Sequence, residues 1–570
     1  MAENTTVDRT CETRYRALFA DGEPIRVKDL ATATAASRPD HDDKHNNEDD
    51  KERKFKGFGV RATRVQLICA VAAMEATWQI AQDFQEEIDA IRQGTRGRRP
   101  GYTAFDAVVF LCGTYIFGGA TAMHFEINPD LAAGPAESLW QTINRRLDAA
   151  RPDRPEQRLS ASFSRFCHDR VRKEYLDGTV LNKLERAAMG HCVDALLSMG
   201  QFNPSSGTYT LPDSTQLIVA DGCKVDGLYN NTDPTKLTKR GNPRNCDREA
   251  FTPEAEPGKT APGPNFEYCM LFSRTPYPQE RMLLGCYIKG EAQRSFSDAT
   301  LCVQVLAQLL EERTEVIEGL YGFGYDMALP AADRDWLLKT GIQPIAKLRR
   351  VTKEKPVMRN YGEQVFTHKT LDETTGVTTE TIALATEVIA IDGTKTVIMP
   401  NGDGDDCYVP LSCIRRYRVT QRTSGYAVYN DLALPDHPIV PKHQQGATIS
   451  MRMDTPLEEL KLDKNTRRPG TISSIPESDP HFEDVFGCRE DAESSNRDLK
   501  AMLRDKRCIT KSRDNNRYQA LGFQLLQLAR AMLAHAKRTN DHHTEIFGQL
   551  LVPDEQQQQQ PPPPKLTIAA

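Results

Sequence analysis

Apolar positions recur at helical spacing through much of the first 200 residues. The clearest segments lie at residues 65–91, 105–117 and 181–199, where apolar residues stand three or four apart with few helix breakers. Between them, the segment 159–175 begins near Ser160, which we interpret as a helix N-cap because serine accepts hydrogen bonds from the first helical turn. The pattern predicts an α-helical N-terminal domain over residues 57–205.

The period of the apolar pattern changes after residue 205. The predicted strands lie at residues 216–221, 266–272, 281–288, 320–325 and 343–348, and the predicted helices at 297–312 and 331–339. Three strands with short connections favour antiparallel pairing, whereas a strand reached through a helix favours parallel pairing. This is the order of an α/β ribonuclease-H-like core, in which the first and fourth strands are neighbours. The first part of that core is predicted over residues 206–348.

The α/β pattern is interrupted and then resumes. Residues 349–480 are rich in Thr, Val, Ile and turn residues, which predicts a β-rich insertion. Helices predicted at 484–506 and 520–538 return the chain to the core, over residues 481–552. The polar segment 1–56 is predicted to be mostly disordered, and the Gln- and Pro-rich segment 553–570 to be a low-complexity tail.

Composition narrows the class of protein. We find no apolar run near the roughly 20 residues that a membrane-spanning helix needs, and no signal peptide after Met1. The 14 cysteines are scattered singly without zinc-site spacing, which predicts reduced core cysteines in a cytoplasmic protein. The net charge of -6 argues weakly against a nucleic-acid binder, but residues 489–538 hold twelve Lys and Arg against six acids. Such a basic segment is compatible with DNA binding.

Two aspartates directly follow predicted strands. Asp221 precedes Gly222, which we expect to let the chain turn away, and Asp326 follows the fourth strand. Carboxylates on neighbouring strands can share a hard cation, and a third on a crossing helix would complete a two-metal site for phosphodiester chemistry. Each aspartate taken alone is more often a turn former. Asp333, which lies within a predicted helix, ranks below Asp326.

The third carboxylate, Glu493, lies in the predicted helix 484–506. Arg489 stands four residues before it and Lys500 seven residues after it, so the three residues would share one helix face, with Arg497 beside them. This face suits a site that holds a charged backbone while cutting it. The alternative interpretation is an exposed helix with ordinary ion pairs.

The spacing Arg489-x3-Glu493-x6-Lys500 resembles the Tyr-x2-Arg-x3-Glu-x6-Lys signature of the insertion-sequence-four family of bacterial cut-and-paste transposases. These enzymes have a DDE triad on a ribonuclease-H-like fold, with a β domain between the second Asp and the Glu. Asp221-Gly-Cys is similar to the family's Asp-Gly-Thr, and the resemblance covers roughly residues 210–538. Phe486 stands where the family has Tyr, so a phosphate contact through that hydroxyl is not expected.

The resemblance implies that Asp221, Asp326 and Glu493 hold two Mg²⁺ ions, which Mn²⁺ can replace. Water would cut the DNA at the element's end, and the freed 3′-hydroxyl would then attack target DNA. Arg489 and Lys500 would bind phosphates near the scissile bond. The implied partners are transposon-end and target DNA and a second copy of the chain in a paired-end complex, and the implied location is the nucleoid of a bacterial cytoplasm.

Other residues are weaker candidates for DNA contacts. The predicted helix 159–175 carries Arg165, Arg172 and Lys173, and it either enters a DNA groove or forms a solvated face of the helical domain. Tyr361 and Tyr417 of the insertion are candidates for stacking on a base, although an ordinary surface or core position is the more common role of tyrosine.

Three functions stay open. The first is an active transposase, the second a domesticated, non-catalytic DNA-binding protein, and the third a metal-dependent DNA nuclease on the same fold. The three acids together with Arg489 and Lys500 favour an enzyme. The β-rich insertion and the separate helical domain favour a transposase over a small nuclease.

Overall fold

The chain is a mixed α/β protein in two compact units. The computed structural model describes residues 16–19, 21–30, 36–37, 61–93, 101–128, 138–161, 163–203, 208–209, 214–226, 265–289, 293, 295–326, 328–348, 356–371, 376–421, 425–454, 473–503, 508 and 512–539. The β-rich unit draws on Met1–Arg53, Phe202–Val219 and Ile317–Arg489. The helical unit draws on Lys54–Gln201, Ala220–Val316 and Glu490–Ala570. The predicted core segment 206–348 is therefore divided between the two units.

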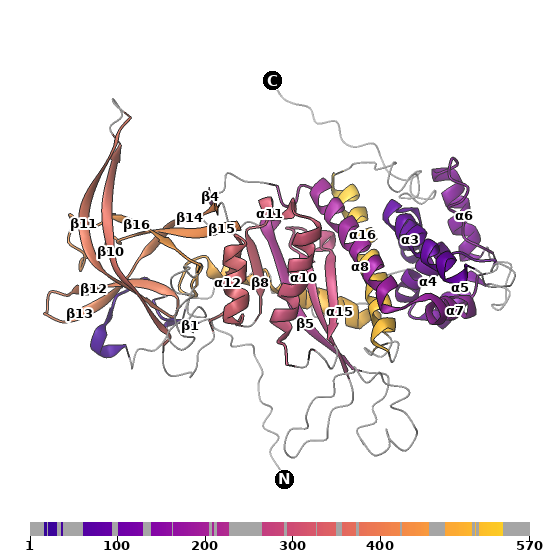
Figure 1. The fold of residues 1–570 in the computed structure, drawn as a ribbon, viewed down its shortest axis with the longest axis horizontal. Helices are drawn as coiled ribbons and strands as arrows, with labels where there is room; N and C mark the ends of the chain where they lie inside the picture. The colour runs from indigo at the N-terminus through magenta and orange to yellow at the C-terminus, as the bar shows by residue number, and fades with distance from the viewer. Residues whose placement is uncertain are drawn as a thin grey trace, which may run out of the picture. The chain divides into compact units, whose positions relative to one another are not determined.

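Helices dominate the first part of the helical unit, as their apolar spacing predicted. They are α2 (Arg61–Ala73), α3 (Glu75–Arg92), α4 (Ala104–Ile116), α5 (Ala120–Ile127), α6 (Leu139–Ala150), α7 (Arg165–Tyr175) and α8 (Gly178–Ser198). Every residue of α4 is buried, and the long α16 (Arg513–Thr539) packs against α4, α2 and α8 (Figure 1). The helical segment predicted at 65–91 is divided, because Met74 is extended (φ -63°, ψ 134°) and separates α2 from α3.

Among the described helices, none alone is long and apolar enough to cross a membrane. The helices α4 and α5, bent by 114° at the break between them, meet that test as a pair, by length and composition only. All twelve described cysteines are unpaired.

Helix α7 begins later than its sequence suggested. Ser164 is the N-cap and accepts a hydrogen bond from the backbone N–H of Cys167. The predicted cap, Ser160, has another role, because its own N–H donates to the carboxylate of Asp106 at 2.6 Å. The buried side of α7 includes His168, which lies 4.9 Å from the ring of Phe110. Tertiary contacts, and not local sequence, decide which serine caps the helix.

A five-stranded sheet carries the two predicted aspartates. Its strands are β5 (Leu217–Asp226), β6 (Asn265–Ser273), β7 (Leu283–Lys289), β8 (Gly322–Tyr325) and β9 (Gln343–Ile345). They are ordered β7-β6-β5-β8-β9, with β6 antiparallel to β7 and β8 parallel to β9. The predicted neighbourhood of the first and fourth strands is confirmed. Residues 217–219 of β5 belong to the β-rich unit and the remainder to the helical unit.

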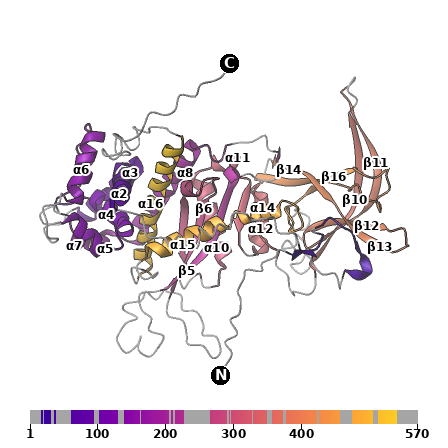
Figure 2. The same cartoon turned by 180° about the vertical axis from the view of Figure 1, so that it is seen from behind.

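Each unit covers its part of this sheet with its own helices. In the helical unit, α10 (Asp298–Glu312) packs on β6 and β7, and α15 (Glu490–Met502) packs on β6. Figure 2 shows α15 from the side on which it covers the strands. In the β-rich unit, α12 (Ala331–Lys339) connects β8 to β9, and α14 (Phe482–Gly487) packs on β8. The short α11 (Val316–Gly319) precedes β8.

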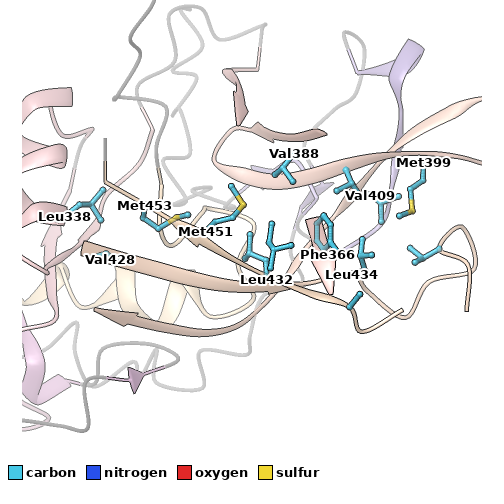
Figure 3. Close-up of a cluster of buried hydrophobic side chains, with 14 residues drawn as sticks. Leu338, Phe366, Val388, Met399, Val409, Val428, Leu432, Leu434, Met451 and Met453 are labelled. Carbon is cyan, nitrogen blue, oxygen red and sulfur yellow. The ribbon is translucent and has the colours of Figure 1, made fainter. Parts of the chain in front are cut away.

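The β-rich insertion forms most of a nine-stranded sheet in the order β2-β13-β12-β11-β10-β16-β15-β14-β4. Its strands are β2 (Ile25–Arg26), β4 (Thr208–Tyr209), β10 (Met358–Leu371), β11 (Thr378–Ile391), β12 (Thr394–Pro400), β13 (Asp406–Pro410), β14 (Ser412–Gln421), β15 (Gly425–Ala433) and β16 (Thr448–Arg452). Phe366, Val388 and Val428 are buried in its core, which Leu338 of α12 joins (Figure 3).

Three short parts of the N-terminal segment, which was predicted to be mostly disordered, are described and form secondary structure. The segment contains β1 (Arg16–Ala17), the 3₁₀ turn η1 (Val27–Asp29) and β3 (Ala36–Ser37), and β1 pairs with β3. Strand β2 pairs with β13, and Arg26 and Lys28 form ion pairs with Asp405 at 3.2 and 2.6 Å. These polar residues are ordered by a partner far away in sequence. The predicted tail 553–570 lies outside the described residues.

Candidate active site

A pocket of about 210 Å³ in the helical unit brings together β5 and α15. Its lining residues are Asp221, Gly222, Cys223 and Lys224 of β5, and Glu493, Asn496, Arg497 and Lys500 of α15. Two of the three predicted carboxylates and two of the predicted cations therefore surround one pocket. The residues from α15 stand at intervals of three, four and seven, which places them along one face of the helix.

Asp221 lies inside β5 and not at its end, which corrects the sequence prediction. The strand continues through Gly222 to Asp226, so the glycine makes no turn. A Cβ atom on Gly222 would instead lie 2.7 Å from Oδ2 of Asp298, the first residue of α10. Because successive side chains of a strand point to opposite faces, Asp221 faces α15 while Gly222 faces α10. Glycine is needed there for close packing.

Helix α15 is fixed at its start by a buried ion-pair cluster. Asp491 lies 2.8 Å from Nε of Arg274 and 2.5 Å from a terminal nitrogen of Arg281, and its side chain is 9% exposed. Acids in the first turn and Lys500 in the last turn also suit the helix dipole. The cluster fixes the start of the helix that carries Glu493, and it therefore helps to position Glu493 in the pocket. Sequence reasoning had not identified it.

Asn496 connects the helix to the strand. Its Nδ2 donates a hydrogen bond of 2.6 Å to Oδ2 of Asp221, across 275 residues of sequence. The side chain is buried, at 7% exposure, and its Oδ1 has no hydrogen-bond partner in the described part of the chain. Asparagine within a helix gives no functional signal in sequence, so this residue was not predicted.

Charged and titratable groups surround the two carboxylates. Burial raises the pKa of the Cys223 thiol to about 11 despite the opposing influence of Lys500, so Cys223 is a neutral thiol near pH 7. Beside the pocket, Lys289 lies 3.0 Å from Glu267 and 3.2 Å from Asp298. Burial, and then the neighbouring Asp298 carboxylate, raise the pKa of Glu267.

Arg489 and Phe486 occupy different places from those predicted. The predicted helix 484–506 is divided into α14 and α15, and Arg489 lies in the turn between them, so it does not share a helix face with Glu493. Phe486 is a core residue of the β-rich unit, at 7% exposure. The guanidinium of Arg489 lies 4.9 Å from its ring centroid, and Nζ of Lys347 lies 5.4 Å from it. Phe486 is therefore a buried ring that contacts two cations, and it is not exposed for a contact with DNA.

Asp326 directly follows β8 in the β-rich unit and is half-buried. Its competitor Asp333 lies in the first turn of α12, in the same unit. Across the residues that the structure describes, no three His, Cys, Asp or Glu side chains are arranged to hold a metal ion. The pocket itself contains two of the predicted carboxylates, Asp221 and Glu493.

The arginines of α7 pair with acids on their own helix. Arg165 and Arg172 lie 3.8 and 3.4 Å from Asp169, and Arg170 lies 2.8 Å from Glu174. Lys173 is exposed, whereas the side chain of Arg172 is only 17% exposed. Phe166 is 79% exposed on the same helix, and this apolar group among cations was not singled out in the sequence.

The tyrosines of the insertion are partly buried. Tyr417 stacks on Tyr429 with ring centroids 5.4 Å apart, and the guanidinium of Arg415 lies 4.8 Å from the Tyr417 ring. Tyr361 lies in the same way below the guanidinium of Arg359, at 5.0 Å. Both tyrosines therefore already have stacking partners within the β-rich unit.

Compared with known proteins, the chain matches no family model and no curated protein.

Proposed function

We propose that the protein is a DNA transposase that cuts element ends and joins them to target DNA by metal-dependent phosphodiester hydrolysis and transesterification. The observation that carries the proposal is the pocket in which Asp221 and Glu493 lie beside Arg497 and Lys500. Carboxylates for a divalent metal next to cations for phosphate are what such chemistry needs.

The order of the strands supports the same proposal. Numbered along the chain, the sheet has the order 3-2-1-4-5, which is that of a ribonuclease-H-like core. The β strands from β10 to β16 separate β9 from the helix that carries Glu493. An insertion at this position is what the resemblance to the insertion-sequence-four transposases implies.

The donor set of the pocket fits Mg²⁺ or Mn²⁺. Asp221 and Glu493 offer carboxylate oxygens, and Oδ1 of Asn496 is a buried oxygen without a hydrogen-bond partner in the described chain. Oxygen ligands of this kind suit hard divalent cations. Asp326, which follows β8, stays the third carboxylate that the resemblance implies. Bound cations would activate the attacking water and stabilise the leaving oxygen.

The positively charged residues divide between two roles in this proposal. Lys500 and Arg497 line the pocket and bind the phosphates that flank the scissile bond. The exposed side of α7, with Arg165, Lys173 and Phe166, contacts the duplex away from the cut. The arginines of the Arg165–Asp169 and Arg170–Glu174 ion pairs are exposed and each pair is worth little, so phosphate oxygens can replace the acids. Two element ends must be paired, so we expect a homodimer on DNA.

The test is a strand-transfer assay with the full-length protein. Labelled duplexes from the DNA on each side of its gene are incubated with a target plasmid and Mg²⁺ or Mn²⁺. Cleavage followed by joining, lost in Asp221→Asn and Glu493→Gln, is the expected result. Cleavage without joining would indicate a nuclease, and specific binding without any reaction would indicate a non-catalytic DNA-binding protein.

A further inference from the structure

We propose that Asn496 is a functional residue of the pocket and that the two polar atoms of its amide have different roles. Its Nδ2 positions the carboxylate of Asp221, and its Oδ1 serves as an additional oxygen ligand for the divalent cation. This inference rests on the proposed function, since it assigns a further ligand to the same pocket.

The hydrogen bond fixes which way the amide faces. An ionised carboxylate has no proton to donate, so the group that contacts Oδ2 of Asp221 at 2.6 Å must be the NH₂ of Asn496. The oxygen of the amide is then the atom left for a second contact. A hydrogen bond to a charged acceptor is also stronger than a neutral one, so it restrains Asp221 within β5.

The remaining oxygen is expensive to leave without a partner. Oδ1 of Asn496 is buried and has no hydrogen-bond partner in the described part of the chain. Removing an amide oxygen from water without a new partner is unfavourable, whereas the same helix face buries Ala492 and Leu499 without any such cost. The hydrogen bond to Asp221 accounts for Nδ2 but leaves Oδ1 unsatisfied. A cation that takes this oxygen as a ligand would satisfy it.

The charges of the pocket make a neutral oxygen ligand useful. Besides two carboxylates, the pocket is lined by three cations, Lys224, Arg497 and Lys500, which oppose the entry of a metal ion. An amide oxygen coordinates a hard cation as carboxylates do, and asparagine contributes to many oxygen-based metal sites. It adds a ligand without adding a further negative charge beside the two carboxylates.

The inference is tested by metal binding, independently of any DNA reaction. Mn²⁺ is titrated into the full-length protein at neutral pH, and the free ion is followed by electron paramagnetic resonance. Asn496→Ala and Asn496→Leu should weaken Mn²⁺ binding by about 10- to 100-fold, the effect typical of losing a group that orients or completes a metal site. Asn496→Asp keeps an oxygen at this position and should bind Mn²⁺ more tightly than Asn496→Ala.

Controls separate this inference from the proposed function. Asn182→Ala removes an asparagine that accepts a hydrogen bond from Arg517 in the same unit, outside the pocket, and should leave Mn²⁺ affinity unchanged. If Asp221→Asn weakens Mn²⁺ binding but neither Asn496→Ala nor Asn496→Leu does, the role of Asn496 is refuted and the metal site stands. If Asp221→Asn also has no effect, both proposals fail. Circular dichroism of each variant excludes loss of folding as the cause.

Discussion

Replacing Gly222 by alanine would place a methyl group against the carboxylate of Asp298. The added Cβ would lie 2.7 Å from Oδ2 and 3.0 Å from Cβ of Asp298, whereas ordinary contacts of this kind begin at 3.4 Å. The difference, 3.4 minus 2.7, requires a movement of about 0.7 Å. Asp298 cannot easily give way, because it begins α10 and lies 3.2 Å from Nζ of Lys289. Part of the movement must therefore pass to β5 and to Asp221.

The magnitude of the effect follows from this displacement. Overpacking a well-packed position costs about 1–3 kcal/mol of stability, and a misplacement of about 1 Å at a reacting centre costs about 100-fold in rate. We therefore expect Gly222→Ala to lower the midpoint of thermal unfolding modestly. DNA cleavage should fall far more, by about two orders of magnitude.

The assay compares cleavage rate, Mn²⁺ affinity and unfolding midpoint in the same preparations. Gly402→Ala is the matched control, because Gly402 has no heavy atom within 4 Å of the added Cβ and is not in a left-handed conformation. Asp298→Ala in the Gly222→Ala background removes the colliding oxygens and should restore part of the activity. Cleavage by Gly222→Ala within twofold of the unmodified protein would refute the reasoning.

Three further predictions concern other residues. His168→Phe should stabilise the protein, because both ring nitrogens of this buried histidine lack hydrogen-bond partners among the described residues. Burial lowers the pKa of His168 from 6.5 to about 3, so the stability that its neutral form gives above pH 6.5 is lost as the pH falls towards 3. The free energy of unfolding of His168→Phe should therefore depend less on pH in that window, and an unchanged pH dependence would contradict this. Lys500→Ala should weaken binding to all DNA sequences and reduce the slope of log K against log salt by about 1 in fluorescence anisotropy, whereas Lys183→Ala should not. Asp491→Asn leaves two largely buried arginines without their carboxylate and should cost about 3–5 kcal/mol in urea unfolding; a loss below 1 kcal/mol would show that the cluster does not hold α15.

The sequence was most informative where local pattern and tertiary structure agree. The strands of the five-stranded sheet and the helix α12 follow from apolar runs and their breaks, because buried strands and amphipathic helices impose those periods. Glu493 and Lys500 were found from their spacing, because seven residues make nearly two helical turns. These features depend on neighbours along the chain.

Other features depend on contacts that the sequence does not encode locally. Asp221-Gly222 suggested a strand end, yet the strand continues, because the glycine serves packing against Asp298. The helix 484–506 was expected to be continuous, yet Arg489 lies in a turn between two helices. Asn496 has significance only through Asp221, which is 275 residues away. No window of neighbouring residues contains that information.

The pairing of β2 with β13 has a consequence for synthesis of the chain. The ion pair between Arg26 and Asp405 joins residues 379 positions apart, so Arg26 leaves the ribosome long before its partner exists. At roughly 5–20 residues per second, the delay is about 20–80 s. Throughout that interval Ile25 and Arg26 have no strand to pair with, because β2 is the outer strand of the sheet and β13 is its neighbour. The nascent chain must therefore keep its beginning soluble and available until its middle has been translated.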